Sequence, residues 1–238
     1  MGLIMATIKN ILNNIRIWLG IFVKYGLVDF FKFTVDYVRI ERQVRENLKT
    51  IAPKYAKQYP GESFEKYLNT KVWIFENLVR VYSLGLHRKT PIRILDIGTG
   101  AGYFPYICNY YGHIAEAVDL PSNEMYNEIM QLLSITRHID CIKPFTDLKI
   151  KKQYDLITGF MICFNNHKQS DLWHVPEWSY FLKTLRDNNL SQDGGVFFSF
   201  NSESLEEPIS MSLLLYFIEN GAEVSGTTVK IMDFTQVS

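Results

Sequence analysis

A chain of 238 residues is long enough for one large domain, or for one domain with a sizeable appendage. Its 25 Lys and Arg residues balance 25 Asp and Glu residues. The chain therefore lacks the basic excess that a phosphate backbone requires, and we expect no nucleic-acid partner. The three cysteines, Cys108, Cys141 and Cys163, have no CxxC spacing. This argues against a disulfide framework or a metal site and predicts a protein of the reducing cytoplasm.

Apolar residues recur at steps of three and four through residues 3–27, which predicts an amphipathic helix. Its polar side carries Lys9, Arg16 and Lys24 and no acidic residue. Charges and glycines interrupt the apolar stretch, so it falls short of the roughly 18 apolar residues that a membrane span needs. Two roles stay open for residues 1–28: packing as a lid or core helix, or peripheral contact with an anionic membrane surface.

A second helical stretch is expected to about residue 49, followed by a break near Pro53 and a turn at residues 59–61. Ser63 is placed to cap a third helix over residues 64–86. Residues 1–90 are therefore predicted to form an N-terminal helical cap, and residues 91–238 to form a second domain.

After Pro91, short β-rich runs alternate with helical segments, which indicates parallel strands joined by right-handed crossovers. The predicted strands are residues 92–97, 115–119, 139–142, 154–160 and 195–201. The predicted helices are residues 103–111, 122–134, 176–190 and 209–220. Two last strand-like runs, 223–225 and 228–234, are too close together for a crossover and should close the sheet as an antiparallel hairpin.

Glycine stands at every second position directly after the first predicted strand, at Gly98, Gly100 and Gly102. Such a turn brings bare main chain close to a ligand, and the helix that follows offers unpaired N–H groups. Asp119 ends the next strand, where a carboxylate can bind ribose hydroxyls. Tyr103 occupies the position where the nicotinamide dinucleotide fingerprint requires a glycine, which argues against that cofactor.

The run from Asp96 to Gly102 resembles motif I of class I S-adenosylmethionine-dependent methyltransferases, acid-x-Gly-x-Gly-x-Gly, and the resemblance extends over residues 92–234. It implies an α/β fold with a Rossmann-like, seven-stranded, mostly parallel sheet whose last strand is antiparallel, and S-adenosylmethionine as the cofactor. By the same resemblance, the cofactor-binding residues are Asp96, Gly98, Thr99, Gly100, Gly102, Asp119, Leu120, Phe145 and Phe160. The family often places an acidic residue after the third strand, on the adenine amino group. Two alternatives stay open here. Asp147 takes the role of that acid, or Phe145 packs on the adenine ring.

Ligands of open α/β sheets bind at the carboxyl ends of the strands, so the segment after the fourth strand is expected to face the methyl donor. Methyl transfer is a direct displacement, and a base is needed only where the acceptor carries a proton. His167 is the first candidate base and His174 the second, with Asn165 placed to orient the acceptor. An ordinary solvated histidine is the competing interpretation of His167.

The predicted function is methyl transfer to a small-molecule acceptor, by an enzyme that is cytoplasmic or peripheral to the membrane. A non-catalytic binding or regulatory module with the same fold is the alternative, and the intact glycines and acids favour the enzyme. An enzyme that acts on protein or RNA is a third hypothesis. The chain has no Asn-Pro-Pro-Tyr motif after the fourth strand, where it has Gly159-Phe160-Met161-Ile162, which argues against methylation of nucleobases.

Overall fold

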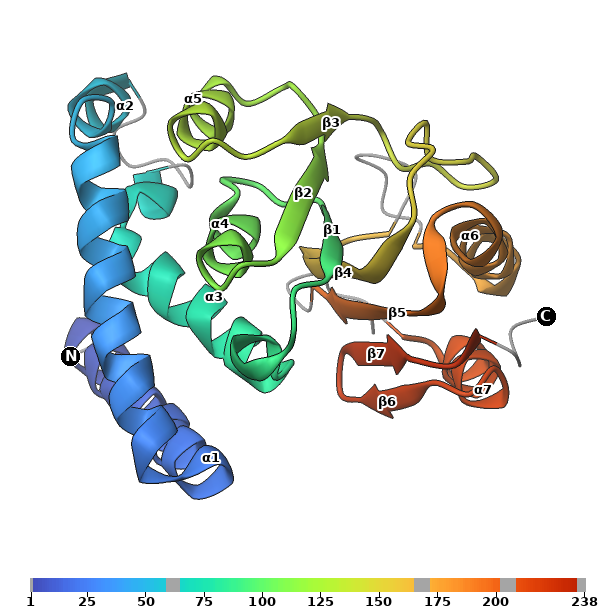
Figure 1. The fold of residues 1–238 in the computed structure, drawn as a ribbon, viewed down its shortest axis with the longest axis horizontal. Helices are drawn as coiled ribbons and strands as arrows, with labels where there is room; N and C mark the ends of the chain where they lie inside the picture. Colours follow the sequence, from blue (N-terminus) through green and yellow to red (C-terminus); the bar gives the residue numbers. More distant parts are fainter. Residues whose placement is uncertain (1, 59–64, 165–171, 202–208, 235–238) are drawn as a thin grey trace. The chain divides into compact units, whose positions relative to one another are not determined.

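The computed structural model describes residues 2–58, 65–164, 172–201 and 209–234, and Figure 1 shows their fold. The chain divides into two compact units, Met1–Arg88 and Lys89–Ser238. Within the described ranges, none of the helices combines the length and the apolar character needed to cross a membrane.

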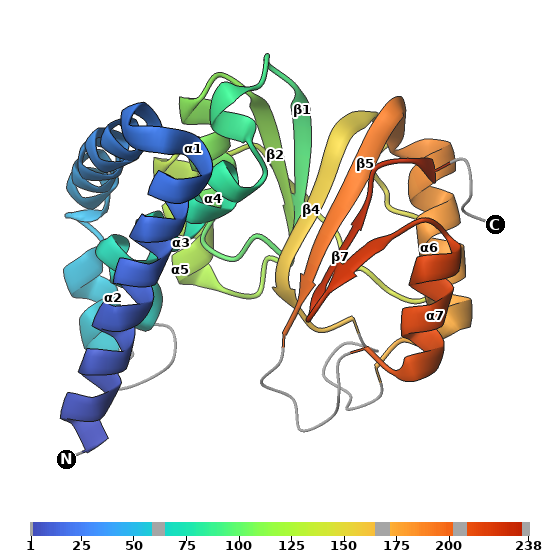
Figure 2. The same ribbon diagram turned by 90° about the horizontal axis from the view of Figure 1, so that it is seen from below.

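The first unit consists of helices. They are α1 (Gly2–Leu48), α2 (Ala52–Gln58), η1 (Glu65–Leu68), α3 (Thr70–Ser83) and η2 (Leu86–Arg88). Helix α1 has two arms (Figure 2), because Gly26 has φ 84° and ψ 178°, far from helical values. Phe33 of α1 is completely buried and packs edge-on against Phe75 and Tyr82 of α3, with ring centroids 5.7 and 4.9 Å apart. Aromatic packing of this kind holds α1 and α3 together.

The break expected near Pro53 is confirmed, because α1 ends at Leu48 and α2 begins at Ala52. Pro53 itself lies in the first turn of α2, where its missing N–H group would be unpaired in any case. One expectation for this unit is wrong in detail. The helix expected over residues 64–86 is divided into a 3-10 turn at Glu65–Leu68, α3 and a second 3-10 turn.

The second unit contains a seven-stranded sheet with the order β3-β2-β1-β4-β5-β7-β6. The strands are β1 (Arg93–Ile97), β2 (Ile114–Asp119), β3 (Arg137–Ile139), β4 (Tyr154–Ile162), β5 (Leu190–Phe200), β6 (Glu223–Ser225) and β7 (Thr228–Ile231). All neighbours from β3 to β5 pair in parallel, whereas β7 is antiparallel to both β5 and β6. The predicted Rossmann-like sheet, with one antiparallel strand from a terminal hairpin, is therefore confirmed.

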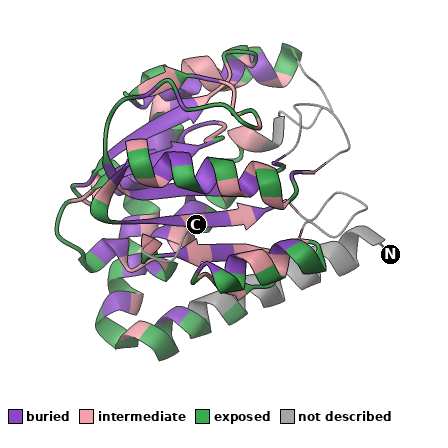
Figure 3. Ribbon diagram, turned by 90° about the vertical axis from the view of Figure 1, so that its right-hand side faces the viewer, coloured by how far each residue is buried: buried purple, intermediate pink, exposed green. Residues whose placement is uncertain are grey.

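Helices cover both faces of this sheet (Figures 1 and 2). Helices α4 (Tyr103–Tyr110) and α5 (Glu124–Leu132) lie on one face, and α6 (Val175–Asn188) and α7 (Met211–Glu219) lie on the other. The central strands are mostly buried (Figure 3), as expected for parallel strands covered on both sides.

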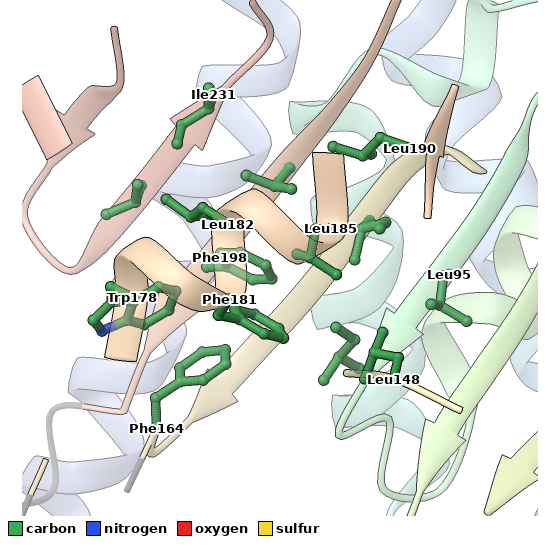
Figure 4. Packing of buried hydrophobic residues seen from close by; sticks show 14 of the residues in the cluster. Leu95, Leu148, Phe164, Trp178, Phe181, Leu182, Leu185, Leu190, Phe198 and Ile231 are labelled. Carbon is green, nitrogen blue, oxygen red and sulfur yellow. The ribbon is translucent and has the colours of Figure 1, made fainter. Parts of the chain in front are cut away.

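Helix α6 supplies much of the core of the second unit. It buries apolar residues at helical spacing, and they pack against Phe164 and Phe198 (Figure 4). The α6 residues in this stripe are Trp178, Phe181, Leu182 and Leu185. The ring centroid of Trp178 lies within 6.0 Å of the ring centroids of several other aromatic side chains. The core next to β4 and β5 is therefore densely aromatic.

Two strands differ most from the sequence prediction. Strand β3 spans Arg137–Ile139 instead of residues 139–142. It ends at Ile139 because the Asp140 carboxylate turns the chain by accepting the N–H groups of Cys141 and Lys149, both at 2.8 Å. Strand β5 begins at Leu190, so that Gly194 and Gly195 lie within the strand, next to a shift in its register with β4.

A polar cluster links β2, β3 and the start of β4. Glu116 of β2 is buried and accepts hydrogen bonds from Lys152 Nζ at 2.9 Å and from the Tyr154 hydroxyl at 2.7 Å. His138 Nε2 of β3 lies 2.6 Å from the same carboxylate. Burial alone would raise the pKa of Glu116, but the hydrogen bonds from Lys152, Tyr154 and His138 outweigh burial and lower it to about 2.

The lowered pKa predicts a pH-dependent contribution to stability. Because the folded-state pKa lies below the ordinary value of 4.5 for a glutamate, this contribution is present above pH 4.5 and is lost as the pH falls through about 2. We expect Glu116→Gln to lower the free energy of unfolding by about 1–3 kcal/mol at neutral pH, and the difference from the wild type to shrink between these two pH values. Urea denaturation across this pH range measures both effects.

Glu223→Gln is the matched control, because Glu223 is exposed and forms only a surface ion pair with Lys230 at 3.0 Å. Its pH profile should follow that of the wild type. Parallel profiles for Glu116→Gln and the wild type would contradict the assignment.

Candidate functional site

A cavity opens at the carboxyl ends of β1, β2 and β4, where ligands of open α/β sheets bind. The residues that line it come from the ends of these strands, the loop after β3 and the segment before α6. They are Ile97, Gly98, Val118, Asp119, Leu120, Asp140, Cys141, Ile142, Ile162, Cys163, Phe164 and Trp173. The sheet order brings these segments together, because β1 lies between β2 and β4.

Asp119 joins the end of β2 to the glycine-rich turn that follows β1. Its Oδ2 atom accepts the N–H of Gly100 at 2.6 Å, and Oδ1 accepts the N–H of Leu120 at 2.7 Å. Burial raises the pKa of Asp119, although these backbone hydrogen bonds oppose the effect. A carboxylate has about four lone-pair positions, so Asp119 can also accept hydroxyl groups from a ligand in the cavity.

The glycine-rich turn needs its glycines for conformation and for space. Gly98 has φ +65°, and a Cβ atom there would lie 2.9 Å from Ile162 Cδ1. Gly100 has φ +59°, and Gly102 is the left-handed N-cap of α4. The hydroxyl of Thr99 is buried, and it has no hydrogen-bond partner among the described residues. The turn thus presents main chain and an unsatisfied hydroxyl beside the cavity.

Asp96 lies inside the sheet, on β1. It is 2% exposed and accepts the Thr158 hydroxyl at 2.7 Å, across the pairing of β1 with β4. Asp96 is not among the residues that line the cavity. The structure therefore gives this acid a visible role in holding β4 against the strand that carries the turn.

The sequence analysis missed Asp140, the acid that lies in the cavity after the third strand. Asp140 is 7% exposed and lines the cavity together with Cys141 and Ile142. The sequence prediction includes Asp140 in a strand over residues 139–142 and therefore does not identify it as a site residue. The informative pattern was an acidic residue directly after a short β-rich run, at Arg137–Ile139.

Phe145, Asp147 and Phe160 lie elsewhere. Phe145 is 55% exposed and packs on Tyr180, with ring centroids 5.8 Å apart. The Asp147 carboxylate accepts the Tyr180 hydroxyl at 2.8 Å. Phe160 packs against Phe104 at 4.7 Å. None of these three residues is among those that line the cavity, whereas Leu120 is.

Phe164 and Trp173 close the cavity on the side of β4 and α6. The N–H of Trp173 donates to the carbonyl oxygen of Phe164 at 2.8 Å. Both side chains are 4% exposed, and the buried Nε1 of Trp173 has no hydrogen-bond partner in the part of the chain that the structure describes. The two rings form an apolar wall with a hydrogen-bond donor in it.

The predicted catalytic residues are described only in part. Asn165 and His167 lie outside the described residues. His174 is exposed and precedes α6, and its backbone N–H donates to the Glu177 carboxylate at 3.0 Å. His174 directly follows Trp173, which lines the cavity, but His174 itself does not.

The contact between Gly98 and Ile162 predicts a steric coupling. We expect Gly98→Ala to destabilise the protein by about 1–2 kcal/mol from the left-handed backbone and by about 1–3 kcal/mol more from the clash with Ile162. Gly112→Ala is the control, because Gly112 has φ +87° and no atom lies within 4 Å of the position that its Cβ would take. Urea denaturation measures both losses.

Ile162→Val removes the Cδ1 atom, so Gly98→Ala should be less harmful in that background. Equal losses for Gly98→Ala and Gly112→Ala would show that Ile162 does not restrict the turn.

No protein-family model and no curated protein matches this chain. Solved structures that resemble it include the ribosomal protein L11 methylase from Lactobacillus delbrueckii subsp. bulgaricus, at 18% identity and a TM-score of 0.41 over 66% of this chain and 77% of that one. A TehB-like SAM-dependent methyltransferase from Corynebacterium glutamicum is 15% identical, with a TM-score of 0.44 over 67% of this chain and 95% of that one.

The glycopeptide N-methyltransferase MtfA, complexed with sinefungin, is 11% identical, with a TM-score of 0.37 over 52% of each chain. The present chain thus spans about half the length of that enzyme. These similarities are too low to support an argument about activity. The strand order, the antiparallel β7 and the glycine turn after β1 give this chain the Rossmann-like fold of class I S-adenosylmethionine-dependent methyltransferases.

Proposed function

We propose that this chain is a cytoplasmic S-adenosylmethionine-dependent methyltransferase that acts on a small-molecule acceptor. The observation that carries the proposal is the pair of carboxylates, half-buried Asp119 and buried Asp140, in one cavity with Gly98 of the glycine-rich turn. All three cysteines are free thiols, in keeping with a reducing compartment.

The residues in the cavity fit the chemical groups of the cofactor. Asp119 would accept hydrogen bonds from the ribose hydroxyls, and Asp140 would accept a hydrogen bond from the adenine amino group. Val118 and Ile142 supply apolar contacts for the flat adenine ring. The unsatisfied Thr99 hydroxyl and the N–H groups at the start of α4 suit the polar methionine end.

S-adenosylmethionine, when bound, supplies a methyl group on a cationic sulfonium. The chain's own contribution is to hold the acceptor in line with that methyl group and to exclude water. Phe164 and Trp173, with Ile162, border the cavity and suit an acceptor that has an apolar or aromatic part. His167 and His174 remain the predicted bases for an acceptor that must lose a proton.

Cofactor binding tests this proposal directly. We expect calorimetry to detect S-adenosylmethionine binding to the wild type and no binding of NADH. Asp119→Asn and Asp140→Asn should each weaken binding about 10- to 100-fold, since a hydrogen bond to a charged group contributes about 1.5–3 kcal/mol. Asp147→Asn is the control, because this carboxylate bonds to Tyr180 and does not line the cavity.

Binding of NADH, or equal affinity of wild type and Asp119→Asn for S-adenosylmethionine, would refute the assignment. If S-adenosylmethionine binds as expected, transfer of a labelled methyl group to members of an acceptor library would identify the substrate class. Tight binding of the cofactor without transfer to any acceptor would instead favour a non-catalytic module.

A further inference from the structure

Helix α1 exposes large apolar side chains on both sides of its kink. They include Phe22, Val23, Val28, Phe31, Val35 and Val38, and each of these is at least 43% exposed. We call the surface that they form, within residues 16–45, the outer face of α1. Several exposed large apolar side chains on one helix are a feature of interaction sites.

Basic side chains accompany these apolar residues. Arg16, Lys24, Lys32, Arg39 and Arg42 are all exposed on the same helix. Lys32 lies four residues after Val28 on the second arm of α1, about one helical turn away, and Lys24 lies on the first arm, before the kink at Gly26. An exposed surface that combines apolar and cationic side chains is typical of helices that lie in a membrane interface.

The acidic residues of this part of α1 are turned away from the exposed side. Residues 16–45 contain three acids, Asp29, Asp36 and Glu41, and all are buried at 6%, 6% and 8% exposure. Asp29 contacts His87 at 3.2 Å and also pairs with Arg88. Glu41 accepts the Thr70 hydroxyl at 2.8 Å. The outer face therefore carries several exposed cations, and the exposed acid beside it, Glu46, pairs with Lys49 at 3.6 Å.

We propose that the outer face of α1 binds the surface of a bilayer that contains anionic phospholipids. Its apolar side chains would enter the acyl boundary while the cations pair with lipid headgroups. A second copy of the chain is a poorer fit. In a two-fold dimer the same face meets itself, so cations would oppose cations. This inference goes beyond the proposed methyl transfer and does not depend on it.

Vesicle flotation of the full chain tests the proposal. We expect binding to vesicles of phosphatidylcholine with phosphatidylglycerol, much weaker binding to phosphatidylcholine alone, and release as salt screens the charges. Each cation near an anionic surface contributes a factor of about five to binding, so Lys24→Gln with Lys32→Gln should weaken it about 25-fold. Val28→Asp should also release the protein, because Val28 is 79% exposed on this face.

Two control variants match these changes in the same helical unit. Val72→Asp alters a valine that is 44% exposed on α3, and Lys57→Gln with Lys71→Gln removes two exposed cations from α2 and α3. Both controls should float as the wild type does, and circular dichroism should show equal helix content in all variants.

Several outcomes would overturn the proposal. They are the absence of vesicle binding, equal binding to neutral and anionic vesicles, and equal losses in the variants and their controls. A dimer in sedimentation analysis that Val28→Asp dissociates would likewise overturn it and assign the face to a second copy.

Discussion

The hydrogen bond from the Gly100 N–H to the Asp119 carboxylate ties together the two loops on which the candidate site depends. It joins the turn after β1 to the end of β2, and it does so only because these strands are parallel neighbours whose carboxyl ends meet. The same carboxylate faces the cavity, so one side chain both shapes the turn and offers oxygen atoms to a ligand. Burial raises its pKa, which makes the backbone donors important for keeping it ionised.

The rest of the second unit keeps those strand ends in place. Thr158 and Asp96 connect β4 to β1 from within the sheet. The aromatic stripe of α6 packs against Phe164 and Phe198, close to where β4 leaves the sheet. Glu116 connects β2 with His138 of β3 and with Tyr154 of β4. The cavity is therefore formed by segments that are each fixed by packing or hydrogen bonds to a neighbouring strand.

The sequence predicted the sheet well because long, buried parallel strands are apolar over most of their length and because the glycine turn has a distinctive spacing. The terminal hairpin followed from its short connection. Short edge strands were less predictable. In Ile139-Asp140-Cys141-Ile142, apolar residues flank one acid, and periodicity alone does not show that the strand stops before Asp140. The choice between Asp140 and Asp147 as the predicted partner of the adenine amino group depends on that single boundary. The roles of His167, Asn165 and the N-terminal cap stay predictions.

The uneven distribution of charge on α1 has a consequence for the whole chain. The net charge is zero, yet α1 has more basic than acidic residues, so the rest of the chain has the matching acidic excess. A negatively charged surface therefore attracts α1 before any contact is made, and salt shortens the distance over which this attraction acts.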